Sequence, residues 1–217
     1  MKLQTAIDRV TLEKMLELSS LLTGHTDIVE VGTSLIKDYG VAASVGAMRG
    51  SFPDMTILAD IKTCDEGAYE FRKAYEAGAD IATAMGFSAE TTLRACAEVA
   101  AEYGKDWFID LLELSENAIY RVAIAFPEAI FGVHLSFDKQ GTGLRELVSR
   151  STRIIRAAEA ADGKLRRIAV AGGVKLDVLP ELRQCGIDTV IVGSAITKAT
   201  DISQAAEVFF RACHETN

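Results

Sequence analysis

The sequence predicts an α/β fold, a single (β/α)8 barrel of the TIM type that spans residues 1–217, on three observations. Short apolar runs alternate from end to end with longer stretches of helical periodicity. The alternation repeats about every 25 residues, as expected for successive βα units. Strands that are apolar on both faces suit a parallel sheet enclosed by helices. No linker interrupts the pattern, which favours one domain.

The expected strands are short and rich in aliphatic side chains. In chain order they lie at residues 3–7, 27–31, 56–59, 81–84, 107–111, 130–134, 168–171 and 189–192. The expected helices have apolar residues three and four positions apart. They lie at residues 11–22, 33–50, 67–77, 90–103, 143–160 and 202–213, and the second is rich in glycine and alanine.

An open doubly wound sheet is the alternative architecture for this alternation of elements. It normally carries a glycine-rich fingerprint directly after the first strand. Here the residues after the first strand are Asp8-Arg9-Val10-Thr11, so the barrel is favoured.

The composition excludes several classes of partner. A formal net charge of −8 argues against nucleic acid or an anionic membrane surface. No apolar stretch approaches the roughly 18 residues of a membrane span, and we expect no signal peptide because Met1-Lys2 leads directly into a strand. The four cysteines are far apart and lack C-x-x-C spacing, which predicts a reduced, cytoplasmic protein without structural zinc.

The run Asp60-Ile61-Lys62-Thr63-Cys64-Asp65 is the most informative in the chain. It places two carboxylates and an ammonium group where the apolar strand 56–59 is expected to end. Burial favours the neutral form of such groups, whereas a close opposite charge favours the ionised form. Groups whose pKa values depend on both effects are often catalytic. A surface salt bridge that contributes at most about 1 kcal/mol is the structural alternative.

Polar residues also follow other expected strands. In a barrel, the carboxyl ends of the strands meet at one mouth and build the active site there. Unpaired charges buried at that mouth would cost several kcal/mol each, so a purely structural role does not account for them. The residues at these positions are Asp8, Glu30, Asp60, Lys62, Asp110, His134, Gly172, Gly173, Gly193 and Ser194.

Three groups of these residues suggest particular chemistry. Glu30 and Asp60 would offer two carboxylates, the ligand type that Mg²⁺ prefers, with room for water and substrate oxygens. Gly172-Gly173 after strand seven and Gly193-Ser194 after strand eight match the usual phosphate-binding loops of barrels, although tight turns also use glycine. His134 at a charged mouth is a candidate acid/base group, and Asp110 either joins the site or orients its neighbours.

These residues together resemble the orotidine 5′-monophosphate decarboxylase suprafamily. The likeness runs nearly end to end and is greatest for its 3-hexulose-6-phosphate synthase and 3-keto-L-gulonate-6-phosphate decarboxylase group. It is carried by the D-x-K-x-x-D run within residues 58–65, by residues 29–33, 170–174 and 190–197, and by Asp8, Val133, His134, Asp138 and Gln140.

The resemblance implies a homodimeric (β/α)8 barrel whose active sites are shared across the interface. It implies that Glu30 and Asp60 help to hold Mg²⁺ and that Lys62 interacts with substrate oxygens and the developing enediolate. Asp65 would reach into the partner's site, and Asp8 would bind substrate hydroxyls. His134 would move protons. Four residues would hold the phosphate: Gly172, Gly173, Gly193 and Ser194.

Within this group, the departures at three positions favour the synthase. Phe137 stands where the decarboxylases carry arginine, and Ala171 and Ser194 stand where they commonly carry threonine and arginine. We therefore expect condensation of formaldehyde with ribulose 5-phosphate through an enediolate, with Mg²⁺ and Lys62 stabilising the charge on oxygen. Decarboxylation of 3-keto-L-gulonate 6-phosphate and non-catalytic binding of a phosphosugar are the alternatives. Glu66 and Ser136 depart from the family pattern without indicating a particular reaction.

Overall fold

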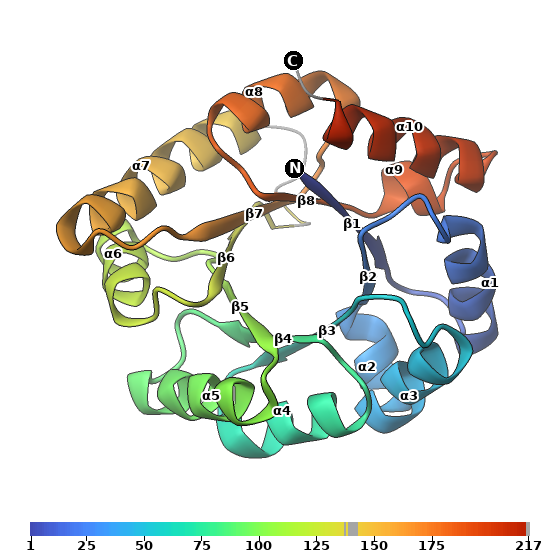
Figure 1. Ribbon diagram of the computed structural model, residues 1–217, viewed down its shortest axis with the longest axis horizontal. Helices are drawn as coiled ribbons and strands as arrows, with labels where there is room; N and C mark the ends of the chain where they lie inside the picture. Colours follow the sequence, from blue (N-terminus) through green and yellow to red (C-terminus); the bar gives the residue numbers. More distant parts are fainter. Residues whose placement is uncertain (137, 139–142, 216–217) are drawn as a thin grey trace.

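The computed structural model describes residues 1–136, 138 and 143–215. Within them, parallel strands close into a barrel in the order of the chain, and helices surround it (Figure 1). The predicted (β/α)8 architecture is confirmed. The strands are β1 (Lys2–Ile7), β2 (Ile28–Val31), β3 (Ile57–Thr63), β4 (Ile81–Met85), β5 (Asp106–Asp110), β6 (Ile130–His134), β7 (Arg167–Ala171) and β8 (Thr189–Val192).

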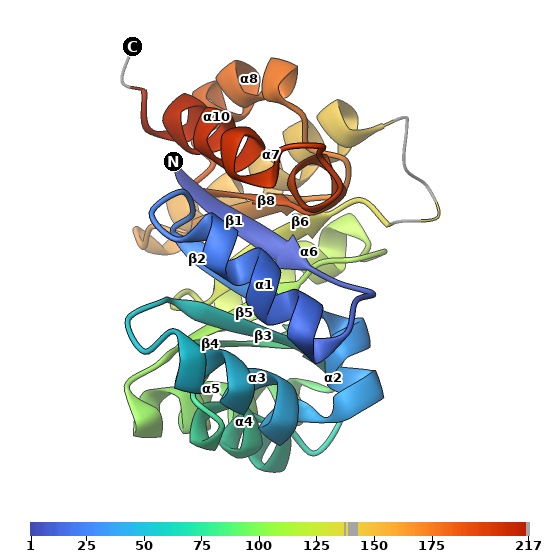
Figure 2. The same cartoon turned by 90° about the vertical axis from the view of Figure 1, so that its right-hand side faces the viewer.

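The helices lie outside the ring of strands, and the side view shows them running along its wall (Figure 2). They are α1 (Leu12–Leu22), α2 (Thr33–Tyr39), α3 (Val41–Ser51), α4 (Gly67–Glu76), α5 (Glu90–Tyr103), α6 (Glu116–Ala125), α7 (Leu144–Asp162), the 3₁₀ turn η2 (Leu176–Val178), α8 (Leu179–Gln184), α9 (Ser194–Thr197) and α10 (Ile202–His214). The sequence predicted eight βα units, but we had assigned no residue ranges to α6, η2, α8 or α9. None of the helices in the described part of the chain is long and apolar enough to cross a membrane.

Two apolar layers hold the barrel together. The larger one lies between the strands and the helices, because every second strand residue points outward. The smaller one lies inside the barrel and is formed by side chains from alternate strand positions. Its buried members, the interior cluster, are Ile28, Leu58, Ile81, Phe108, Ile130 and Ala169.

The third strand differs from the expectation. It was expected to end at residue 59, but β3 continues to Thr63, so Asp60 and Lys62 lie within it. The register with β4 shifts between Ala59 and Thr63, and Lys62 has a φ of +49°. Such a bulge bends the strand and redirects a side chain, and here it lies at the end of the barrel where the polar residues gather.

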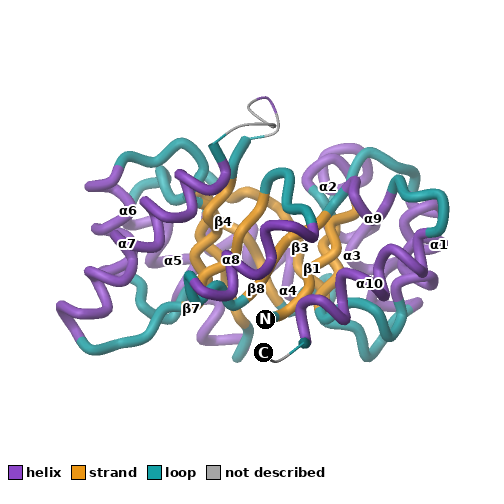
Figure 3. Tube along the Cα trace, turned by 90° about the horizontal axis from the view of Figure 1, so that it is seen from above, coloured by secondary structure: helices purple, strands orange, loops and turns teal. Residues whose placement is uncertain are grey.

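The segment 33–50 was expected to be one helix, and that prediction was wrong. It forms α2 and α3, which meet at Gly40 with a φ of +83°. A left-handed residue ends a helix, and glycine adopts that conformation without a steric penalty. Figure 3 shows α2 and α3 as separate segments beside the strands.

Candidate active site

The polar residues of the strands converge inside the barrel at the end where the strands finish. Each follows a member of the interior cluster by two or four positions on the same strand, so its side chain points to the same side. This alternation explains how isolated acids in separate strands meet. The residues placed in this way are Glu30, Asp60, Asp110 and His134.

Lys62 lies between two of these carboxylates. Its Nζ is 3.0 Å from Asp60 Oδ2, 3.1 Å from Asp60 Oδ1 and 3.0 Å from Asp110 Oδ2. Burial lowers the pKa of Lys62, but Asp60, Asp110 and Glu30 more than offset that effect and raise it above its usual value. Lys62 is therefore a fixed cation near neutral pH and is suited to stabilising negative charge rather than to acting as a base.

Asp110 joins Lys62 to His134. The buried Asp110 carboxylate accepts from Lys62 Nζ and lies 2.9 Å from His134 Nδ1 through the same oxygen, Oδ2. Because an ionised carboxylate only accepts, Nδ1 donates the proton and leaves Nε2 of a neutral His134 free to take one. Burial lowers the pKa of His134, but the hydrogen bond to Asp110 outweighs it and raises that pKa above its usual value.

Two threonine hydroxyls hold the Asp60 carboxylate from both sides. Thr33 Oγ1 donates to Asp60 Oδ2 at 2.6 Å, and Thr83 Oγ1 donates to Asp60 Oδ1 at 2.9 Å. The Thr83 hydroxyl also accepts from the backbone N–H of Lys62 at 2.9 Å. The sequence analysis had assigned neither threonine a role in the site.

Glu30 is the third carboxylate of this group. Gln4 Nε2 donates to Glu30 Oε2 at 2.5 Å, and Gln4 is another buried residue that the sequence analysis missed. Burial, followed by repulsion from Asp60, raises the pKa of Glu30 to about 7. The Glu30 carboxyl is therefore partly protonated near neutral pH.

This donor set fits a magnesium ion. No three His, Cys, Asp or Glu side chains of the described residues are arranged as a complete metal cage. Mg²⁺ does not need one, because it usually binds one or two carboxylates and keeps water or substrate oxygens in its other positions. A divalent cation beside Glu30 would also favour the ionised form of its carboxyl group.

Asp8 and Asp65 lie outside the directly bonded group. Asp8 follows β1, is exposed, and accepts from both the backbone N–H and the hydroxyl of Ser34. Asp65 is exposed, and its Oδ1 accepts from the N–H of Glu66 at 2.8 Å. Among the described contacts of its own chain, Asp65 has none with Asp60, Lys62 or His134.

The two predicted glycine loops differ in backbone geometry. Gly172 and Gly173 have φ values of +100° and +73°, and a Cβ at Gly172 would lie 2.3 Å from the carbonyl oxygen of Leu135. Gly193 has a φ of −103° and a ψ of −100°, so it does not share the positive φ of Gly172 and Gly173. Ser194 opens the short helix α9, whose first N–H groups have no carbonyl partner within the helix. The predicted residues Phe137 and Gln140 lie outside the described part of the chain.

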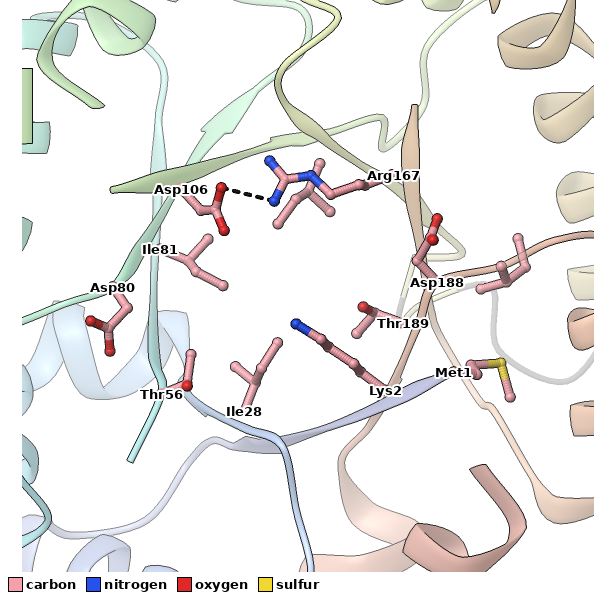
Figure 4. A pocket seen from close by; sticks show the side chains of 12 residues that line it. Met1, Lys2, Ile28, Thr56, Asp80, Ile81, Asp106, Arg167, Asp188 and Thr189 are labelled. Carbon is pink, nitrogen blue, oxygen red and sulfur yellow. Dashed lines mark hydrogen bonds and ion pairs between the residues drawn. The ribbon is translucent and has the colours of Figure 1, made fainter. Parts of the chain in front are cut away.

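A separate cavity of about 320 Å³ lies at the opposite mouth, where the strands begin (Figure 4). Its carboxylates have structural partners: Asp106 pairs with Arg167 at 2.8 Å, and Asp80 pairs with Arg49 and Lys105. These ion pairs lie at the amino-terminal ends of the strands. The polar residues of the candidate site lie at the opposite, carboxyl-terminal ends.

The family profile described as orotidine 5′-phosphate decarboxylase / HUMPS matches residues 1–209. The chain belongs to this family. A member of the family from Bacillus subtilis (strain 168), named 3-hexulose-6-phosphate synthase, is 35% identical over 207 residues, which cover 95% of each chain.

Solved structures of the family agree with the barrel. A crystal structure of 3-hexulose-6-phosphate synthase superposes with a TM-score of 0.87 at 31% identity and covers 98% of this chain and 99% of that one. A crystal structure of KGPDC from Streptococcus mutans has a TM-score of 0.83 at 22% identity, covering 98% and 96% of the two chains. At that identity the second likeness shows the fold alone.

Proposed function

We propose that the protein is a 3-hexulose-6-phosphate synthase, an aldolase that joins formaldehyde to ribulose 5-phosphate. The observation that carries this proposal is the bonded group of Asp60, Lys62, Asp110 and His134 at the mouth of a barrel of this family. It supplies a fixed cation next to a histidine whose second nitrogen has no hydrogen-bond partner among the described residues. Relatives that are 35% and 33% identical over most of the chain carry the synthase name.

The residues suit an enediolate mechanism. His134 Nε2 takes the proton from C1 of ribulose 5-phosphate, and the electron pair of that C–H bond forms the enediolate. The Lys62 ammonium stabilises the negative charge that develops on oxygen. The enediolate carbon then attacks formaldehyde, and His134 returns the proton to the formaldehyde oxygen, which becomes the hydroxyl of the new hydroxymethyl group.

Glu30 and Asp60 would hold Mg²⁺ next to the reacting oxygens, where its positive charge would favour the enediolate. Asp8 would bind substrate hydroxyls. The loop with Gly172 and Gly173 and the start of α9 at Gly193 and Ser194 would hold the phosphate with backbone N–H groups. Contacts to the phosphate, remote from the reacting carbon, would position the sugar.

We infer a homodimer in which Asp65 of each subunit completes the site of the other. Asp65 is exposed and lacks a contact with the described site residues of its own chain. Two large apolar side chains of the neighbouring elements are exposed, Tyr69 in α4 by 61% and Phe87 after β4 by 59%. A partner subunit on this face would cover both. We place the reaction in the cytoplasm, where the four free cysteines stay reduced.

One assay separates this function from its alternatives. The purified protein is given ribulose 5-phosphate with formaldehyde, or 3-keto-L-gulonate 6-phosphate alone, each with Mg²⁺ and with excess chelator. We expect Mg²⁺-dependent consumption of formaldehyde. Release of CO₂ from the keto acid phosphate as the faster reaction would instead identify a decarboxylase, and binding without turnover of either substrate would identify a phosphosugar-binding barrel.

Single substitutions test the two central roles. Lys62→Ala and His134→Ala should each lower turnover by at least about a hundredfold, the scale expected for an oxyanion-stabilising or proton-transfer group. The measurement is kcat for formaldehyde consumption at saturating Mg²⁺. Near-wild-type turnover in both variants would contradict the assignment.

A further inference from the structure

The hydroxyl of Thr83 occupies a special position in β4. It is the one side-chain group described here that contacts both the carboxylate of Asp60 and the backbone of Lys62. Thr83 is 2% exposed and belongs to a strand that is buried throughout. Its hydroxyl both accepts and donates, which valine, its closest match in shape, cannot do.

The contact with Lys62 falls where the backbone of β3 is irregular. The register between β3 and β4 shifts between Ala59 and Thr63, so the regular ladder does not supply a partner for every backbone group there. Lys62 has a φ of +49°, a conformation that is unfavourable for a residue with a side chain and persists only where its surroundings enforce it. The Thr83 hydroxyl takes the place of the missing carbonyl for the Lys62 N–H.

We propose that Thr83 is a positioning residue, whose hydroxyl fixes the bulge of β3 so that Asp60 and the Lys62 ammonium hold their places in the site. The Thr83 hydroxyl bonds both to the backbone N–H of Lys62 and to Oδ1 of Asp60. The Lys62 Nζ in turn lies 3.0–3.1 Å from the two oxygens of the Asp60 carboxylate. The link to turnover rests on the proposed synthase function, but the link to backbone geometry does not.

Thr33 allows the two contacts of Thr83 to be separated. Its hydroxyl donates to the other oxygen of Asp60 and does not contact the Lys62 backbone. Removal of the Thr33 hydroxyl therefore loosens Asp60 and leaves the acceptor for the Lys62 N–H in place. Thr152 in α7 is a control for the substitution itself, since it is buried and its hydroxyl has no hydrogen-bond partner among the described residues.

The experiment compares Thr83→Val with Thr33→Val, Thr152→Val and wild type. Hydrogen exchange of the Lys62 amide, followed by NMR, reports the bulge without any assumption about the reaction. Steady-state kinetics with ribulose 5-phosphate and formaldehyde report the site. In Thr83→Val we expect the Lys62 amide to exchange at least tenfold faster than in wild type. We also expect a kcat lower by about 10- to 100-fold, the loss typical when a residue that hydrogen-bonds to and orients a site residue is removed.

In Thr83→Val, the KM for ribulose 5-phosphate should stay within about threefold of the wild-type value. The residues proposed to bind the substrate phosphate follow β7 and β8 and do not depend on Thr83. Thr33→Val should lower kcat but leave the exchange of the Lys62 amide as in wild type. Thr152→Val should leave both unchanged. Thr83→Ser keeps the hydroxyl and should restore most of the kcat and the protection of the amide.

The outcomes are distinct. Wild-type exchange of the Lys62 amide in Thr83→Val, or an equal acceleration in Thr33→Val, would overturn the inference. A wild-type kcat in Thr83→Val would overturn it as well. Absence of turnover in wild type itself would overturn the proposed function instead, and the exchange data would still test the bulge. If Thr83→Val does not fold, Thr83→Cys against Thr83→Ser makes the same comparison, since a thiol is a weak donor and acceptor.

Discussion

Asp110 connects Lys62 to His134, because its Oδ2 accepts a hydrogen bond from each of them. Its other oxygen accepts the N–H of Leu112 at 2.9 Å, which fixes the carboxylate in the strand end. Burial raises the pKa of Asp110, but the hydrogen bond from His134 and the charge of Lys62 outweigh it and lower that pKa. The carboxylate is therefore ionised throughout the neutral range.

This arrangement predicts the effect of Asp110→Asn on the pH–rate profile. His134 accepts a proton only when it is neutral, so kcat/KM should rise with pH through its raised pKa. Loss of the Asp110 charge lowers the pKa of His134 and should move this acid limb to lower pH. The plateau should fall at least about tenfold because the tautomer is no longer enforced.

The check is kcat/KM measured from about pH 5 to about pH 9 in wild type and Asp110→Asn. His134→Ala is the control and should lack the limb altogether. An acid limb at the same pH in Asp110→Asn would mean that a group other than His134 titrates in the reaction.

The sequence predicted the charged residues of the site and missed the neutral ones that orient them. Lys62 and Asp60 stand out because charges are costly at the end of a buried strand. Gln4, Thr33 and Thr83 do not stand out, since hydroxyls and amides also occur in strands and at helix starts. A usable signal existed for Gln4 and Thr83: each is a polar residue at an inward position of an apolar strand.

At the scale of elements, the sequence did not predict where β3 ends or where the short helices lie. Periodicity gave the strand positions within one or two residues except at the end of β3, where a bulge lets the strand continue through charged residues. A bulge depends on the register with the neighbouring strand, which the sequence of one strand does not contain. The helices α8 and α9 are too short to show a period.

The interior of the barrel is narrow where β5 and β6 meet, and this predicts the effect of Gly132→Ala. A Cβ at Gly132 would lie 2.2 Å from two ring carbons of Phe108, which is itself buried in the interior cluster. We expect overpacking to lower the free energy of unfolding by about 1–3 kcal/mol. The measurement is urea denaturation followed by circular dichroism.

Gly46→Ala in α3 is the matched control for that experiment. Apart from Gly46 itself, its chain neighbours and the backbone of α3, no atom of the described residues lies within 4 Å of a Cβ built there, so alanine should maintain or raise stability by up to about 1 kcal/mol. Equal stability of Gly132→Ala and wild type would show that the Phe108 ring moves aside freely.

At the scale of the whole molecule, barrel closure is what turns scattered residues into a site. Glu30 and His134 are far apart in the sequence, yet closure in chain order brings every strand end to one rim. This is why the fold class and the list of charged candidates followed from the sequence. Their actual bonds did not follow, because they depend on register and side-chain direction around the ring.

The shared-site dimer makes a quantitative prediction for mixed variants. Lys62→Ala and Asp65→Ala should each be nearly inactive as pure proteins. In a hybrid dimer, one site has both defects and the other has neither, because Lys62 comes from one subunit and Asp65 from the other. Random reassortment makes half of the dimers hybrids, so the mixture should recover about a quarter of wild-type activity.

The mixture is prepared by unfolding and refolding the two variants together, and activity is compared with that of each variant refolded alone. Wild type refolded in the same way gives the reference. Recovery should grow with the hybrid fraction, measured by native mass spectrometry. If Asp65 acted in its own subunit, every site of the hybrid would keep one defect and activity would stay at the level of the pure variants. Asp65 is exposed and has no described contact with the bonded group of its own chain, which is the reason to expect recovery.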